Sequence, residues 1–427
     1  MRLLIKNGYV IDPASKKEGI YDVLVQDDTI AAVEPCIDVV AERVIDAKGL
    51  TVMPGFIDLH VHLREPGFEY KETIKTGSMA AAAGGYTTIC PMPNTKPAID
   101  SKEMVEWLLK KAKTDACIRI LPVGAVTVGQ EGKELADIIG MATAGAVALS
   151  EDGKSVMDTA LYCEAMKIAK ELKMPIFAHC EDKTLVRGGV MNAGKKAEQL
   201  GLPGITNAVE DIITMRDILL AKETGASLHL CHCSTKASVD FVEWAKKEGL
   251  PVTAEVCPHH FTMTEEDIGK DDANYKMNPP LRAVEDKEQL RKGLANNIME
   301  VISTDHAPHS AEEKAKSMLT SPFGIVGSET AYALSITELV ETGLLTSMQL
   351  VEKMSTNPAK VLQMENKIGC LKVGAYADIV LANPKEEYII EAEKFYSKGK
   401  NTPFDGMKVK GRIYMTIVEG KIVYERE

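Results

Sequence analysis

Between residues 55 and 364, short apolar runs alternate with segments whose apolar residues recur at helical spacing. Each run has the length of a strand, and each following segment has the i, i+3, i+4 periodicity of an amphipathic helix, clearest within 104–109, 161–172, 212–219 and 239–245. Eight runs occur, and they end at His60, Pro91–Asn94, Val123–Val126, Ser150–Asp152, His179, His232, Cys257–His259 and Asp305. Eight β-then-α units in about 300 residues predict an α/β fold, a (β/α)8 barrel of the TIM type.

The two ends of the chain have a different pattern, in which apolar runs are separated by turn residues alone. The first 54 residues contain six runs, at Leu3–Ile5, Tyr9–Ile11, Asp22–Val25, Ile30–Val33, Arg43–Ile45 and Thr51–Met53. Near the other end, Glu419-Gly420 is a plausible hairpin turn between two further runs. We therefore expect a small β-sandwich composed of both ends. The predicted domains are residues 1–54 (N-terminal part of the sandwich), 55–364 (barrel) and 365–427 (C-terminal part).

Residues with useful chemistry fall where the predicted barrel strands end. They are His60, His62, Asn94, Asp152, His179, His232 and Asp305. Catalytic residues of (β/α)8 enzymes gather at the carboxyl ends of the strands. Chance placement of all these residues at strand ends is a poor explanation, so the pattern favours a catalytic rim.

His60 and His62 are two residues apart, so in a strand their imidazoles point to the same face. This pair alone is equally compatible with two hydrogen-bonded histidines in a buried strand. Four histidines and two aspartates at one rim favour a metal site, because imidazole with carboxylate suits zinc and related metals. Two ions need a bridging ligand, which Asp152 could supply. The alternative for Asp152 is a turn residue before Gly153.

Composition and charge narrow the function classes. The chain is 45% hydrophobic and 26% charged, as in an ordinary globular protein, and its net charge of −12 argues against nucleic-acid or anionic-membrane binding. No run approaches the roughly 18 apolar residues of a membrane span. Nine cysteines without a disulfide pattern predict a reducing, cytoplasmic location. Cys231-His232-Cys233 could be a metal motif, but in a strand both thiols point away from His232, so we interpret them as core residues.

Two longer motifs carry a resemblance to a known family. Asp58-x-His60-x-His62-x-Arg64-Glu65-Pro66-Gly67 and Ser303-Thr304-Asp305-His306-Ala307-Pro308-His309 resemble the paired signatures of dihydroorotases of the long-chain, class I type, in the amidohydrolase superfamily. The resemblance covers essentially the whole chain and includes Met92–Thr95, Ala178–Glu181, Cys231–Thr235, Glu255–His260, Lys276–Arg282, Ser321–Gly324 and Gly369–Val380.

The resemblance implies two divalent ions per chain, which we expect to be Zn²⁺. His60, His62 and Asp305 would hold one ion, and His179 and His232 the other. Many superfamily members bridge the ions with a carboxylated lysine. Here the matching stretch has the Asp-Gly form, so Asp152 would be the bridge, with Lys154 two residues further on.

The implied activity is the reversible cyclisation of N-carbamoyl-L-aspartate to L-dihydroorotate in de novo pyrimidine (UMP) biosynthesis. A metal-activated hydroxide would attack the ring carbonyl, with Asp305 as general acid and base. The resemblance also implies substrate contacts. Arg64, Asn94 and His309 would bind the α-carboxylate, and Asn278 with the backbone of Phe323 and Gly324 would bind the ring amide groups. His62 is a further implied substrate contact. The polar stretch 310–321 is expected to form a mobile loop over the site.

Two alternatives use the same motifs. A hydantoinase or allantoinase would open a different cyclic ureide, but Arg64 is pointless for a substrate without an α-carboxylate. A non-catalytic, dihydroorotase-like scaffold for aspartate transcarbamoylase would not need the complete set of ligands. The expected partners are the small-molecule substrate and a second copy in a homodimer, with a complex with aspartate transcarbamoylase as a further candidate.

Overall fold

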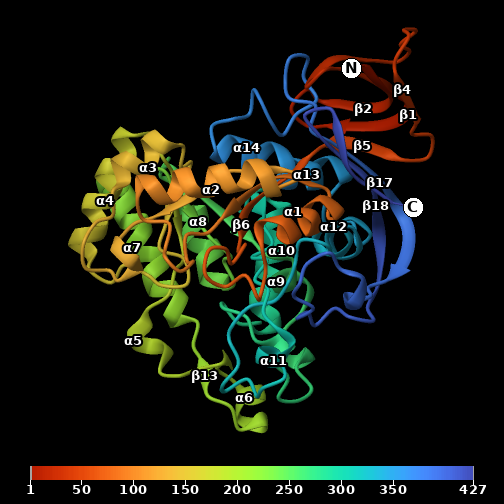
Figure 1. Ribbon diagram of the computed structural model, residues 1–427. Coiled ribbons are helices and arrows are strands. Elements are labelled where there is room, and N and C mark those ends of the chain that lie inside the picture. The colour runs from red at the N-terminus through yellow and green to blue at the C-terminus, as the bar shows by residue number, and fades with distance from the viewer. Residues whose placement is uncertain (1, 427) are drawn as a thin grey trace.

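The computed structural model describes residues 2–426, and the two ends of the chain meet in one sheet, visible at the upper right of Figure 1. Eight strands take part, in the order β19-β18-β17-β5-β1-β2-β3, with β4 paired to β1. Their bounds are β1 (Arg2–Asp12), β2 (Lys17–Gln26), β3 (Thr29–Glu34), β4 (Arg43–Asp46), β5 (Thr51–Pro54), β17 (Ile379–Ile389), β18 (Lys408–Val418) and β19 (Lys421–Glu425). The antiparallel pair β5–β17 joins the two ends, and Ile5, Val25 and Leu381 share one buried apolar cluster.

The prediction of six strands in residues 1–54 is wrong, because five form. The first two runs are one strand, β1, in which Asn7-Gly8 makes a bulge instead of reversing the chain. Asn7 has φ +62°, and the register against β2 shifts between Ile5 and Gly8. The Glu419-Gly420 hairpin turn is confirmed: both residues have positive φ, +48° and +74°, as a type I′ turn requires.

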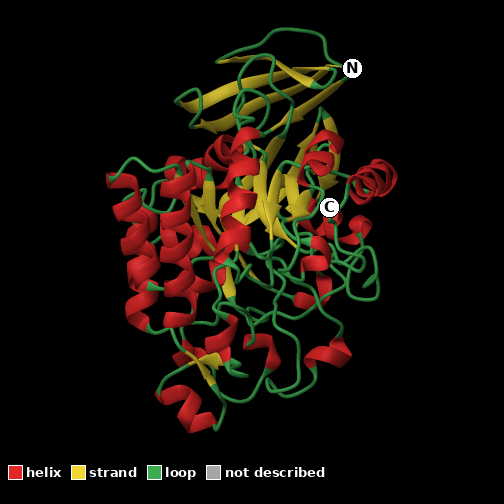
Figure 2. Cartoon of the chain, turned by 90° about the vertical axis from the view of Figure 1, so that its left-hand side faces the viewer, coloured by secondary structure: helices red, strands yellow, loops and turns green. Residues whose placement is uncertain are grey.

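The middle of the chain forms parallel strands, which lie at the centre of Figure 2 with helices beside them. One run has the order β6-β7-β8 and the other β16-β15-β14-β11-β10-β9. The bounds are β6 (Phe56–Val61), β7 (Tyr86–Pro91), β8 (Arg119–Ile120), β9 (Val123–Ala125), β10 (Ala148–Ser150), β11 (Ile176–Ala178), β14 (Leu228–Leu230), β15 (Val252–Val256) and β16 (Val301–Ile302). Each of the eight predicted runs therefore contains strand, and the protein is a mixed α/β fold.

The four segments with the clearest helical spacing form helices: they lie in α2, α4, α7 and α8. Ser101 and Asp158 cap the first two of them by accepting backbone N–H bonds. The larger helices are α1 (Ile74–Ala83), α2 (Lys102–Asp115), α3 (Ile138–Ala144), α4 (Thr159–Glu171), α7 (Ala208–Thr224), α8 (Lys236–Lys247) and α10 (Val284–Ala295). Shorter ones are α5 (Lys183–Val186), α6 (Lys195–Leu200), α9 (Pro258–Thr262), α11 (Ala311–Lys314), α12 (Ala331–Ser335), α13 (Ser347–Val351) and α14 (Asn357–Val361), and β12 (Met191–Asn192) pairs with β13 (Gly204–Ile205).

The carboxyl ends of the parallel strands lead into the loops that carry the candidate site residues. His60 lies inside β6, and Asp152, His179 and His232 follow β10, β11 and β14 within two residues. In residues 2–426 no helix combines the length and the apolarity that crossing a membrane requires. The nine cysteines are all free thiols.

Candidate metal centre

Asp152 lies among four buried imidazoles. Its Oδ1 is 3.1 Å from His60 Nε2, 3.5 Å from His179 Nδ1 and 3.7 Å from His232 Nε2. Its Oδ2 is 3.5 Å from His62 Nε2. Burial acts to raise the pKa of the Asp152 carboxyl, but the facing charge of His60 and the imidazole hydrogen bonds outweigh it and hold that pKa well below its ordinary value. This carboxylate therefore stays ionised at the centre of the cluster.

The donor set fits a divalent cation. Two groups of three buried side chains place their ligand atoms within 4.8 Å of one another: His60, His62 and Asp305, and His60, Asp152 and His232. His62 Nε2 is 3.0 Å from Asp305 Oδ1, and His179 Nδ1 is 2.9 Å from His232 Nε2. His60 Nε2 is fully buried and has no hydrogen-bond partner. An unpaired imidazole nitrogen facing two carboxylates is the arrangement that a metal ion satisfies.

Backbone contacts at the strand ends hold this cluster in place. The buried carboxylate of Asp58 accepts hydrogen bonds from His60 N and Thr304 N, both at 3.1 Å, and from Thr304 Oγ1 at 2.5 Å. It thus links the end of β6 to the segment that carries Asp305, and burial raises its pKa to about 7. Asp305 and His232 have φ of +48° and +34°. Left-handed backbone at residues other than glycine is strained, and such strain is concentrated at functional sites.

Glu255, on β15, is a residue to which the sequence analysis assigned no role. Its Oε1 is 3.1 Å from His60 Nδ1, and its Oε2 is 3.0 Å from His229 Nε2. Burial opposes ionisation of Glu255, but the hydrogen bonds from His229 and His60 outweigh it and lower its pKa. When His60 is neutral, its one ring hydrogen lies on Nδ1 and is donated to Glu255, so the Nε2 lone pair is free to bind a metal ion in the cluster. The missed signal was an acidic residue inside a strand that is otherwise uncharged and largely apolar.

A small cavity of about 100 Å³ opens beside the cluster. It is lined by His62, Arg64, Asn94, Asp152, Gly153, His179, His232, Asn278, Asp305, Ala307, Phe323 and Gly324. Every residue predicted to bind substrate is among them except His309. That imidazole lines a neighbouring cavity and lies 3.2 Å from Arg64 Nη2 and 2.7 Å from Phe323 O. His309 therefore supports the cavity wall from behind.

The two asparagines of the cavity also make contacts within the protein. Asn94 accepts a hydrogen bond from His62 Nδ1 at 2.9 Å and donates one to Asp152 Oδ2 at 3.0 Å. It thereby orients two members of the cluster while it faces the cavity. Asn278 donates to the carboxylate of Glu181, a second acidic residue to which sequence reasoning gave no role.

The segment 310–321 is anchored by several contacts. Lys276 Nζ donates to Ser321 O at 2.6 Å, and Asp271 accepts a bond from Met318 N at 2.7 Å. Lys314, in α11, is buried and donates to Pro322 O at 3.1 Å; burial lowers its pKa to about 7. The mobility expected for this loop stays a prediction, and any opening must break these bonds.

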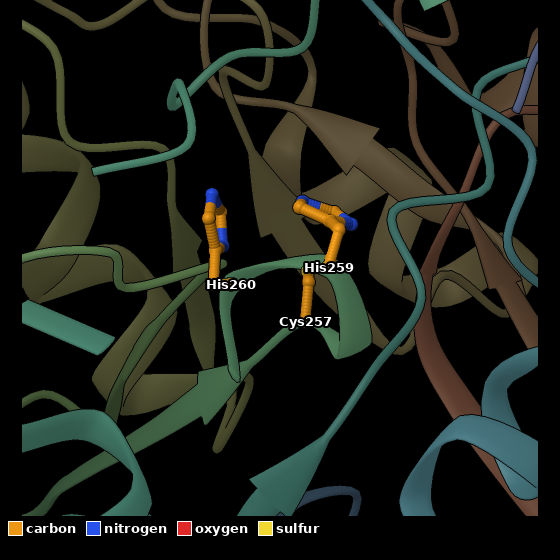
Figure 3. Close-up of side chains that lie close together, drawn as sticks. All are labelled: Cys257, His259 and His260. Carbon is orange, nitrogen blue, oxygen red and sulfur yellow. The ribbon is translucent and has the colours of Figure 1, made fainter. Parts of the chain in front are cut away.

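Lys154 and the group Cys257, His259 and His260 are further potential metal ligands, but their contacts indicate structural roles. Lys154 Nζ donates to Gln130 O at 3.0 Å, outside the cluster around Asp152. Cys257, His259 and His260 lie together on and before α9, where both imidazoles project to the same side of the short helix (Figure 3). Burial lowers the pKa of both histidines, and the nearby Arg282 guanidinium adds to this at His260. His260 Nε2 donates to Pro279 O at 3.0 Å and is therefore already engaged, so we interpret this group as packing.

The chain is similar to known proteins over its full length. A family model described as Dihydro-orotase-like matches residues 49–238. A dihydroorotase of Caldanaerobacter subterraneus subsp. tengcongensis is 48% identical, covering 100% of this chain and 98% of that protein, and one of Syntrophus aciditrophicus is 46% identical, covering 100% of both. Among solved structures, the L-hydantoinase (dihydropyrimidinase) of Arthrobacter aurescens superimposes with a TM-score of 0.90 at 29% identity, covering 99% of this chain and 96% of that one. A dihydropyrimidinase of Brevibacillus agri has a TM-score of 0.87 at 25% identity, covering 100% and 95%.

Proposed function

The chain belongs to the dihydroorotase family, and from that premise we propose that it interconverts N-carbamoyl-L-aspartate and L-dihydroorotate in pyrimidine biosynthesis. The observation that carries the substrate assignment is Arg64, whose guanidinium lines the cavity beside the Asp152 cluster. A fixed cationic fork binds a carboxylate with two hydrogen bonds. Carbamoyl aspartate carries an α-carboxylate, which is the group that this fork would bind.

We propose that two divalent ions, zinc by donor preference, complete the site. His60, His62 and Asp305 would hold one, His179 and His232 the other, with Asp152 between them; its 3.1–3.7 Å contacts to all four imidazoles support that role. When bound, such ions acidify a water and polarise a carbonyl oxygen. The protein's own contribution is to orient the imidazoles, through Glu255 for His60 and Asn94 for His62.

Asp305 is the proposed general acid and base. Its carboxylate lines the cavity, and His62 Nε2 lies 3.0 Å from its Oδ1. In ring opening it would take the proton of the attacking water and deliver it to the leaving ring nitrogen; ring closure reverses these transfers. Arg64 and Asn94 would hold the α-carboxylate, and Asn278 with the backbone at Phe323-Gly324 would meet the ring amide.

We extend the proposal to the architecture, with a (β/α)8 barrel over residues 55–364 and a β-sandwich from residues 1–54 and 365–427. The unbroken series of parallel pairs from β9 to β16 supports closure, as does the parallel bridge between Val61 and His306, which brings the end of the series back to β6. The proposed setting is a homodimer in the cytoplasm, to which the nine free thiols lend support. Light scattering of the purified protein measures the oligomer, and co-elution with aspartate transcarbamoylase tests that partner.

The test of function is a side-by-side assay with carbamoyl aspartate, dihydroorotate, hydantoin and allantoin. We expect turnover of the first two and little of the others. Hydantoin turnover exceeding that of dihydroorotate would favour the second candidate, a hydantoinase. The structural similarity to hydantoinases supports this candidate, whereas Arg64 in the cavity argues against it. A folded, metal-loaded protein without activity on any of the four would favour the scaffold.

A further inference from the structure

A second cavity, of about 270 Å³, lies behind His309 and shares no lining residue with the catalytic cavity. Its wall is formed by α11 with its flanking residues and by the loop that precedes β18. The charged residues on this wall are Lys314, Lys398 and Lys400. Among residues 2–426 no aspartate or glutamate lines the cavity, although the chain has a net charge of −12. The cavity therefore gathers positive charge in an acidic protein.

Lys314 is the most buried of the three cations. Only 8% of the residue is exposed, and its ammonium donates to two uncharged acceptors, Lys276 O at 3.2 Å and Pro322 O at 3.1 Å. Burial and the neighbouring charge of Lys276 lower the pKa of Lys314 to about 7. An ammonium has three N–H groups, so one is left for a ligand. Fully buried lysines are ordinarily paired with an acidic group, so an anion would complete this one.

Lys398 and Lys400 also donate only to backbone oxygens. Lys400 Nζ lies 2.6 Å from Phe395 O and 3.0 Å from Ser397 O, and Lys398 Nζ lies 2.6 Å from Glu69 O. Lys400 thus keeps one N–H group for a ligand and Lys398 keeps two. Within the described part of the chain, neither ammonium forms an ion pair with a carboxylate.

The nearby acidic residues do not cancel this charge. Asp272 and Glu313 act on Lys314 from outside the cavity, but the effects that lower its pKa outweigh both carboxylates. Glu313 is also engaged by Lys71 in an ion pair of 2.9 Å. Burial and the neighbouring cations lower the pKa of His309 as well, which indicates the same positive potential. The surroundings of the cavity therefore favour an anion.

We propose that this cavity binds a small oxyanion, a phosphate or carboxylate group, through Lys314, Lys398 and Lys400. Ammonium groups form strong, charge-assisted hydrogen bonds with such oxygens. The bound anion would join α11 to the loop before β18 and so restrain the segment 310–321 beside the catalytic cavity. The inference does not depend on the proposed function, because it concerns binding outside the catalytic cavity.

Isothermal titration of inorganic phosphate into the purified protein at low salt measures the binding. We expect the affinity to fall at least about tenfold in Lys398→Met, which removes one exposed cation of the wall, and further in Lys314→Met. Lys316→Met is the matched control, because it removes an exposed lysine of the same segment that does not line the cavity. It has the same change in net charge as Lys398→Met and should bind phosphate like the parent.

A parallel titration with succinate, a dicarboxylate, distinguishes the two ligand classes. Binding of both anions with the same dependence on Lys398 assigns the site to small oxyanions in general. Binding of only one of them, with that dependence, assigns the site to phosphate or to carboxylate groups alone.

Hydrogen exchange locates the site. With saturating phosphate, the backbone amides of residues 310–315 should exchange more slowly in the parent and in Lys316→Met, but not in Lys398→Met. Phosphate binding that is unchanged in both Lys314→Met and Lys398→Met, as expected for an ion held at the metal centre, would overturn the proposal. The absence of binding of either anion at millimolar concentrations would do the same.

Discussion

Asp305 is the residue at which ligand geometry and proton transfer meet. Its Oδ1 lies 3.0 Å from His62 Nε2 and 3.6 Å from His60 Nε2, and its backbone is left-handed. Asp305→Asn keeps an oxygen for a metal but loses the ability to carry a proton. We predict a fall in kcat of about 10²–10⁴-fold with metal content largely intact. Steady-state kinetics and elemental analysis of the same sample measure both, and near-normal turnover would refute the acid–base role.

Arg64 selects the substrate in our proposal. Losing a charge-assisted hydrogen bond costs about 1.5–3 kcal/mol, so Arg64→Met should lower kcat/KM for carbamoyl aspartate by about 10–100-fold. Any residual turnover of hydantoin, a substrate without a carboxylate, should have the same rate in Arg64→Met as in the parent, and it serves as the internal control. Parental kinetics on carbamoyl aspartate would instead strengthen the hydantoinase alternative.

The residues that the sequence could identify are those whose spacing or position carries information. The His60-x-His62 pair and the aspartates at strand ends were found in this way, and the structure brings them together. Glu255 and Glu181 were missed because their roles come from contacts between segments distant in sequence.

At the scale of elements, Glu329 connects the start of α12 to a loop near the C-terminal strands. It accepts bonds from Tyr396 N at 3.0 Å and Ser397 N at 3.1 Å, and burial raises its pKa from 4.5 to about 8. Between these values the folded protein keeps a proton that the unfolded chain releases. The free energy of unfolding therefore falls as pH rises through this window, and stability is greatest at its acidic end.

Glu329→Gln removes this ionisation while its amide oxygen can still accept one of the two backbone bonds; the loss of the other is the same at every pH. We predict that the Tm of the variant relative to the parent increases from pH 5 to pH 8. Thermal unfolding at both pH values measures the difference, and Glu393→Gln, at an exposed position, is the control. An equal Tm difference at both pH values would contradict the assignment.

Strands and helices with strong periodicity could be predicted, and boundaries set by single residues could not. All eight strand runs of the middle region were found, but the third is divided into β8 and β9 at Leu121-Pro122, where proline lacks an N–H. The short pair β12–β13 has two residues per strand and no pattern to detect. Asn7-Gly8 looks like a turn in sequence, and only the pairing partner makes it a bulge.

For the whole molecule we predict about two bound ions per chain and a folded state that depends on them. A ligand at 100 times its Kd stabilises the protein by about 2.7 kcal/mol, so chelation should lower the Tm by several degrees and abolish turnover. Elemental analysis and thermal unfolding before and after chelation give both numbers, and zinc added back should restore them. A folded, never-chelated protein without metal would remove the proposed mechanism.

The sheet built from both chain ends has a consequence for synthesis on the ribosome. β5 ends at residue 54 and its partner β17 begins at residue 379, so 324 residues lie between them. At about 5–20 residues per second, the edge of β5 waits about 16–65 s for its partner to be made. During that interval the nascent strands β1–β5 expose an unpaired edge, which is a template for aggregation. Translation speed and chaperone supply should therefore affect the yield of this protein more than that of one whose sheet is completed by neighbouring segments.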